Sequence, residues 1–223
     1  MKRIKLAIIF NIIIIVMDVF ATILMITGIQ IIGHSQTLTE TGYHALQFFT
    51  VDSNLLVLAT SILMLIYYLL MMNKKIEALP NWLKIVRLCS VVGVTLTMLT
   101  TVFYLGFIVT TGYLSLFYNA NLFYHLLVPL FSIISFILFE QEVDLKKNQC
   151  FYGLIPTVLY SIYYITNVFT HYDHGVSNFY DFYGFAQGGV IGMIISFIVM
   201  LGITLLISFV LLLVKNGRRK ENA

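Results

Sequence analysis

The chain has 223 residues, of which 60% are hydrophobic and only 10% are charged. A soluble domain of this length needs far more polar surface, so the composition excludes an ordinary soluble globular protein. The formal net charge of +3 does not indicate a nucleic-acid partner, because the basic residues are confined to short segments beside long apolar runs.

Six apolar runs follow one another along the chain, and each has the length that a membrane-spanning helix needs. They cover residues 6–32, 45–72, 85–111, 120–139, 151–170 and 188–214. The first run begins like a signal peptide but continues without a small-residue cleavage site, so we expect a retained span. Backbone in lipid must bond internally, and no strand-like alternation occurs. The sequence therefore predicts an all-α polytopic membrane protein whose single domain covers residues 1–223.

All thirteen Lys and Arg residues lie at the N-terminus, in the second and fourth gaps between the runs, or in the tail. They are Lys2, Arg3, Lys5, Lys74, Lys75, Lys84, Arg87, Lys146, Lys147, Lys215, Arg218, Arg219 and Lys220. Because cytoplasmic loops keep basic residues, this pattern predicts that both termini are cytoplasmic. Frequent Ile, Asn and Lys favour a low-GC bacterium. We therefore expect a multi-pass protein of the bacterial cell membrane.

The polar side chains inside these runs need an explanation, because an ionisable group in hydrocarbon is costly. They are Asp18, Thr50, Asp52, Ser53, Asn54, Tyr104, Thr110, Thr111, Asn121, His125, Tyr163, Tyr164, Thr166 and Asn167. Apart from Asp18, which is near the middle of its run, most are at a similar depth in the outer half. The cytoplasmic half is expected to hold almost nothing comparable. The pattern predicts a cavity that opens outward or into the outer leaflet.

Helical spacing divides the polar residues of the second run between two faces. Thr50 and Asn54 are four residues apart and share a face. Asp52 points elsewhere, about 200° around the helix from Thr50. An Asn amide on the face of Thr50 could donate to an oxyanion or orient a catalytic group.

Asn121, His125 and Pro129 are also spaced four residues apart, in the fourth run. Pro129 leaves the carbonyl of His125 without its usual helical bond and predicts a kink there. A shielded histidine can act as a general base, and a threonine hydroxyl becomes a nucleophile when such a base takes its proton.

Each of these residues also has a purely structural explanation. Threonine in a membrane helix usually bonds a backbone carbonyl of the preceding turn. A histidine or Asn54 can simply bond a neighbouring helix. Asp18 could be protonated, or paired with Asn11, Thr22 or another span. The residue pattern alone leaves an enzyme, a transporter and helix packing open.

Two further patterns concern ions and helix packing. His171, Asp173 and His174 form a compact group, and His34 and His44 lie in another outer loop. These residue types suit zinc, but without a dedicated spacing motif we predict no metal site. Small residues recur every four positions at Gly184, Gly188, Gly192 and Ser196. That spacing allows close helix contact, either within the chain or between two copies.

Two segments go beyond composition. One reads Phe-Phe-Thr-Val-Asp-Ser-Asn-Leu-Leu-Val over residues 48–57, and the other reads Asn-Leu-Phe-Tyr-His-Leu-Leu-Val-Pro over residues 121–129. They resemble the androgen-induced family of membrane threonine hydrolases and its bacterial six-span relatives. Animal members hydrolyse fatty-acid esters of hydroxy fatty acids with a threonine nucleophile and a histidine partner. The resemblance implies that Thr50 is the nucleophile and His125 its partner, and that no cofactor is required.

The span positions agree with this assignment, since Thr50 and His125 would both lie roughly 8 Å below the same surface. The first hypothesis is therefore an intramembrane hydrolase whose substrate is a membrane lipid or fatty-acid ester. Asn54 or Asn121 would stabilise the oxyanion or orient the histidine. The supporting residues would be Asp52, Asp18, Ser53 and Asn167.

Two other functions remain open. A small proton-coupled transporter would use Asp18, Asp52 and His125 as a titrating relay. The absence of a convincing repeat between the first three and last three runs weighs against it. A non-catalytic lipid-binding protein of the same fold is the third hypothesis.

Overall fold

The computed structural model describes residues 2–32, 40–108, 112–171, 180–186 and 188–221, and this part of the chain is helical without strands. The helices are α1 (Lys2–Thr27), η1 (Gly42–Gln47), α2 (Phe49–Met72), α3 (Asn81–Thr100), η2 (Thr101–Leu105), α4 (Gly106–Ile108), η3 (Tyr113–Phe117), α5 (Ala120–Leu122), η4 (Phe123–Leu127), α6 (Val128–Ile134), η5 (Ser135–Phe139), η6 (Lys147–Leu154), α7 (Ile155–Thr170) and α8 (Gly189–Glu221). Of the η segments, η1, η3 and η6 are 3₁₀ helices, and η2, η4 and η5 are π-helical turns.

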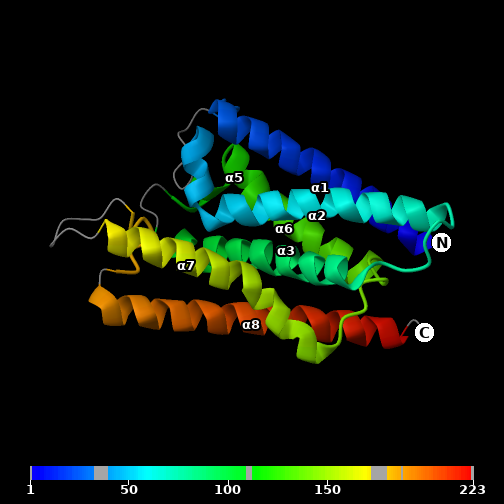
Figure 1. Cartoon of the computed structure of the whole chain (residues 1–223). Coiled ribbons are helices and arrows are strands. Elements are labelled where there is room, and N and C mark those ends of the chain that lie inside the picture. The colour runs from blue at the N-terminus through cyan, green and yellow to red at the C-terminus, as the bar shows by residue number, and fades with distance from the viewer. Residues whose placement is uncertain (1, 33–39, 109–111, 172–179, 187, 222–223) are drawn as a thin grey trace.

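The long helices run side by side along a common axis, with α1 and α8 on opposite flanks and α3 between them (Figure 1). The start of α1, the connection from α2 to α3 and the end of α8 lie at one end of the bundle. We call this the basic end, because the Lys and Arg residues lie in these segments and in the connection that precedes η6. The other end, which carries η1 and the start of α2, is the aromatic end.

Within the described residues, five helical segments are long and apolar enough to cross a membrane. They are Arg3–Thr27, Phe49–Met72, Asn81–Leu105, Ala120–Phe139 and Gly189–Arg218. This confirms the all-helical prediction and fits a multi-pass membrane protein. The expected span at 151–170 differs, because its first residues belong to the 3₁₀ helix η6 and α7 has only 16 residues. Pro156 in the first turn of α7 is compatible with a helix start there.

One stripe of α1 is buried along almost its whole length. It consists of Ala7, Asn11, Ile14, Asp18, Ala21 and Met25, spaced alternately four and three residues apart. The buried clusters place Ala7 with Met64, Ile14 with Val57, and Ala21 with Val51 of the antiparallel α2. This register puts Asp18 at the level of Asn54.

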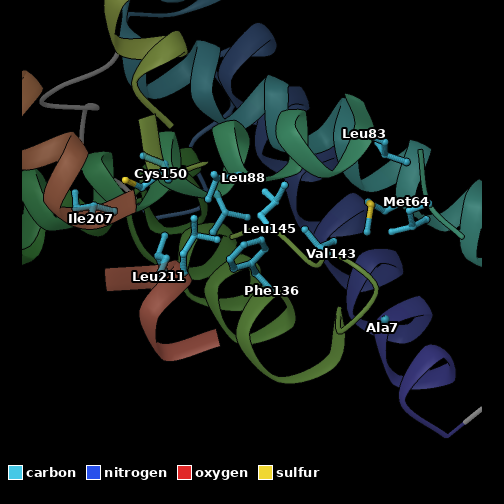
Figure 2. Packing of buried hydrophobic residues seen from close by; sticks show 14 of the residues in the cluster. Ala7, Met64, Leu83, Leu88, Phe136, Val143, Leu145, Cys150, Ile207 and Leu211 are labelled. Carbon is cyan, nitrogen blue, oxygen red and sulfur yellow. The ribbon is translucent and has the colours of Figure 1, made fainter. Parts of the chain in front are cut away.

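The largest cluster of buried apolar side chains lies towards the basic end (Figure 2). It brings together Ala7 of α1, Met64 of α2, Leu88 of α3, Phe136 of η5 and Leu211 of α8. In the absence of a hydrophobic driving force between helices in lipid, such contacts stabilise the bundle by close packing.

Buried charges lie beside this cluster, so the half of the bundle towards the basic end is not the almost apolar half that the sequence predicted. The Arg87 guanidinium donates two bonds to the Glu140 carboxylate, Nε to Oε2 at 2.9 Å and Nη2 to Oε1 at 2.6 Å. Neither side chain is exposed. Asn11 and Ser135 also donate to Glu140, at 3.3 and 2.7 Å, and Arg87 donates to Ser61 at 3.1 Å.

Lys215 is also buried, and its ammonium donates to the carbonyls of Phe136 and Glu140 and lies 4.4 Å from the centre of the Phe136 ring. The sequence interpretation treated Arg87 and Lys215 as interfacial anchors. Instead, α3 begins at Asn81, so Arg87 is more than a turn inside the helix, where only another buried group can pair with it.

Helices approach one another closely at glycines that lie outside the predicted stripe of small residues. A Cβ on Gly153 of η6 would lie 2.4 Å from the Ser208 Oγ of α8 and 3.1 Å from a methyl of Val92 in α3. Ser208 donates to the Cys150 carbonyl at 2.7 Å, which fixes that hydroxyl against η6.

The predicted stripe itself is only partly helical. Gly184 has a positive φ of 70°. Both Gly184 and Gly188 lie before the start of α8. A Cβ on Gly188 would meet Gly192 rather than another helix. The first glycines of the stripe therefore shape the turn into α8.

We expect Glu140→Gln to lower the free energy of unfolding by about 3–5 kcal/mol, because it leaves the Arg87 charge buried without its partner. Asp144→Asn is the matched control, since Asp144 pairs with Lys84 at a site where its side chain is 40% exposed, and we expect at most about 1 kcal/mol. Unfolding by SDS titration in mixed micelles measures both. Equal effects of the two substitutions would contradict this role for Glu140.

The same ion pair predicts that the protein loses stability at low pH. Burial alone would raise the pKa of Glu140, but the Arg87 guanidinium opposes it and the pKa lies below its ordinary value. Because the folded pKa is depressed, the contribution to stability is complete above the unfolded pKa of about 4.3 and is lost as the pH falls through the folded pKa. The Glu140→Gln variant should lack this part of the pH dependence of the free energy of unfolding.

Gly153→Ala should destabilise the bundle by roughly 1–3 kcal/mol, because the added methyl overlaps Ser208 and Val92. Gly202→Ala on α8 is the control, since a Cβ there meets nothing within 4 Å. Thermal unfolding in detergent compares the two variants. A Gly153→Ala midpoint no lower than that of Gly202→Ala would show that η6 can move away.

Candidate functional site

Thr50 is the second residue of α2, so its hydroxyl has no carbonyl of a preceding turn of α2 to bond. The hydroxyls of Thr22, Thr27, Thr60, Thr95, Thr170 and Thr204 all bond a backbone carbonyl three or four residues back. Among the described residues the hydroxyl of Thr50 makes no such bond, since no α-helical turn precedes it. The general structural explanation for a membrane threonine therefore does not apply to this half-buried side chain.

The backbone of Thr50 is held by two side chains of the next turn. Its carbonyl accepts from Ser53 Oγ at 3.1 Å and from Asn54 Nδ2 at 2.7 Å. The Ser53 hydroxyl lies 3.2 Å from the hydroxyl of Thr97 in α3 and can accept from it. A Cβ on Gly93 would be 3.2 Å from that of Ser53, so a glycine allows this close contact.

Asn54 links Thr50 to the neighbourhood of His125. Its Nδ2 also donates to the carbonyl of Tyr124 at 3.1 Å, so one amide joins α2 to η4 at the residue before the histidine. Both Nδ2 hydrogens are then used, and none remains for an oxyanion. Of the two roles predicted for Asn54, this geometry favours the positioning one.

His125 lies in the π-helical turn η4 and is 2% exposed. Pro129 has no N–H for the His125 carbonyl, and the chain accommodates this loss with a wider turn. The His125 Nδ1 is 3.0 Å from the carbonyl oxygen of Leu116 in η3. Because a carbonyl only accepts, Nδ1 carries the hydrogen, and in the neutral ring Nε2 keeps its lone pair.

Asn121 and Asp18 are fully buried near this region. Asn121 lies one turn before His125, and its N–H bonds the Tyr118 carbonyl at 3.0 Å. The carboxylate oxygens of Asp18 have no hydrogen-bond partner among the described residues. Thr22, one of the partners considered for Asp18, bonds its backbone carbonyl at 2.7 Å and not its carboxylate.

Asp52 and Asn167 lie elsewhere. Asp52 is exposed in a groove between α2 and α7. Asn167 is in the last turn of α7, where its carbonyl accepts from His171 Nδ1 at 2.9 Å. Asn54 therefore links the Thr50 backbone to Tyr124, the residue before His125, whereas Asp52 faces the groove. Among the described residues no hydrogen bond joins Thr50 to His125.

The described residues include only part of the candidate metal ligands. Asp173, His174 and His34 lie outside the described residues, as do Thr110 and Thr111. In the part of the chain that the structure describes, no group of three His, Cys, Asp or Glu side chains could hold a metal ion.

Comparison of the chain with protein-family models, curated proteins and solved structures found no match. The resemblance to the androgen-induced family therefore depends on the two quoted motifs, and the site is interpreted from its own geometry.

We expect nitrogen NMR of the ¹⁵N-histidine protein to show His125 as the Nδ1–H tautomer at neutral pH, because the Leu116 carbonyl fixes that hydrogen. His44, whose side chain is exposed, should show exchange between tautomers and is the internal reference. An Nε2–H tautomer at His125 would contradict the assignment of Nε2 as the proton acceptor.

Proposed function

We propose that the protein is an intramembrane hydrolase of lipid esters, with Thr50 as nucleophile and His125 as general base. The observation that carries the proposal is the 3.0 Å contact between His125 Nδ1 and the Leu116 carbonyl. This contact orients the ring and leaves Nε2 as a proton acceptor, which is the arrangement that a base needs. The Thr50 hydroxyl, which bonds no backbone carbonyl of a preceding turn, supplies the group to be activated.

In the proposed reaction, Thr50 Oγ attacks the ester carbonyl carbon while Nε2 of His125 takes the hydroxyl proton. The tetrahedral intermediate collapses, the alcohol leaves with that proton, and an acyl group remains on Thr50. Water then attacks the acyl carbon with His125 again accepting a proton, and the carboxylic acid leaves as the proton returns to Thr50. Asn54 acts as a positioning residue, because it ties the Thr50 turn to η4.

The proposal includes a six-span topology in a bacterial cell membrane with both ends cytoplasmic. Its support is the common position of the start of α1 and the end of α8 (Figure 1) and the basic residues gathered there. The sixth crossing would be η6 together with α7, because 16 residues of α-helix alone span only about 24 Å. Thr50 and His125 would then lie at the depth of the outer leaflet, from which acyl chains would enter.

The test is hydrolysis of a fatty-acid ester of a hydroxy fatty acid by the detergent-purified protein. We expect Thr50→Ala and His125→Ala each to lower turnover by about 10²-fold or more, because each removes a group that acts in the transition state. Thr50→Ser should retain measurable activity. Thr95→Ala is the matched control, since that buried hydroxyl bonds only its own helix at the Val91 carbonyl.

Unchanged turnover in Thr50→Ala would exclude the threonine nucleophile. If the wild type hydrolyses no lipid ester, the buried Asp18 favours the transporter as second candidate. In that case Asp18→Asn should abolish a pH-dependent flux in liposomes.

A further inference from the structure

A groove of about 440 Å³ lies between α2 and α7 on the side of α2 that Asp52 occupies. Its apolar lining comes from Leu46, Leu56, Pro156 and Leu159. Leu159 is 63% exposed, so the groove adjoins the outer surface of α7. In a membrane this surface faces acyl chains, and the lining suits an aliphatic chain.

Three aromatic rings line the same groove. The rings of Phe49 and Tyr160 are 5.2 Å apart, and those of Tyr160 and Tyr163 are 5.9 Å apart. The Tyr160 hydroxyl donates to the Gln47 carbonyl at 2.6 Å, which fixes the middle ring. Tyr163 is 46% exposed and presents its ring to an occupant.

Asp52 places a carboxylate in this lining, and among the described residues no Lys or Arg pairs with it. Every Lys and Arg belongs to the segments at the basic end, whereas Asp52 is in the first turn of α2 at the aromatic end. The ion pairs of the described residues are Lys84 with Asp144 and Arg87 with Glu140.

The described histidines at the aromatic end have other contacts. His44 stacks on Tyr43 with 4.0 Å between ring centroids. His171 bonds the Asn167 carbonyl and stacks on Tyr180 at 3.8 Å. Within the described residues, Asp52 therefore has no cationic partner.

We propose that this groove binds a membrane lipid whose headgroup carries an ammonium ion. Asp52 pairs with the ammonium, the faces of Tyr160 and Tyr163 contribute cation–π attraction, and the acyl chain lies along the leucine lining. A soluble amine would leave that lining uncovered, whereas an anionic lipid would place its charge against Asp52. The groups proposed to bind the ammonium, Asp52, Tyr160 and Tyr163, are not among the described contacts of Thr50 and His125. The failure of this proposal and that of the proposed hydrolase are therefore distinguishable.

Native mass spectrometry of the purified full chain tests the lipid preference. The probes are dioleoyl-phosphatidylethanolamine, dioleoyl-phosphatidylglycerol and dioleoylglycerol, which share acyl chains and differ in headgroup. The wild type should retain the ethanolamine lipid roughly tenfold better than the other two, as expected for one charge-assisted hydrogen bond. Asp52→Asn should remove this preference, and Glu40→Gln, an exposed carboxylate in the η1 connection, should keep it.

A second pair of variants separates ligand binding from helix stability, since Asp52 also favours the N-terminus of α2 by its charge. Tyr163→Leu should lower retention of the ethanolamine lipid several-fold, whereas Tyr163→Phe, which keeps the ring, should not. Equal retention of all three lipids by the wild type would overturn the proposal. So would a preference that survives in Asp52→Asn, or one that is lost equally in Glu40→Gln.

Discussion

The buried pair of Arg87 and Glu140 is the constraint on which the helix arrangement depends. Neither ion can reach water, so each must be satisfied by groups from neighbouring helices. The pair is also hydrogen-bonded to Ser61 of α2, Asn11 of α1 and Ser135 of η5. Beside it, the Lys215 ammonium of α8 donates to the backbone carbonyl of Glu140. Sliding any of these helices by one turn would leave a buried charge or donor without its partner.

The candidate site depends on this fixed register at the aromatic end. With α1, α2 and the η4 region held together, Asn54 can bond the carbonyls of Thr50 and Tyr124 at once. The two ends of the bundle have different roles. The basic end holds Arg87, Glu140 and Lys215 in closed contacts, whereas the aromatic end presents Thr50 and Asp52 at partly exposed or exposed positions. Polar groups that the fold already satisfies stabilise it, and those left accessible are the ones available to a substrate or ligand.

The first turn of α2 serves two sides of the helix. Asn54 bonds η4, and Thr50 lies one turn earlier on the same face of α2, while Asp52 faces α7. The proposed ester chemistry and the proposed ammonium site therefore share one short segment but use different reactive side chains, Thr50 and Asp52. Ser53 lies between them, since it lines the groove and also donates to the Thr50 carbonyl.

Hydropathy was enough to predict an all-helical membrane protein and most helix positions, because backbone in lipid must bond within its own helix. Local spacing was enough to separate Asp52 from Thr50 and Asn54, because helical periodicity decides which residues share a face. They misjudged Arg87 and Lys215, since a basic residue near a helix end looks the same whether it meets headgroups or a buried carboxylate. The Leu116 carbonyl that orients His125 carries no residue-type signal at all. Such partners come from distant segments, so they become visible once the helices have packed.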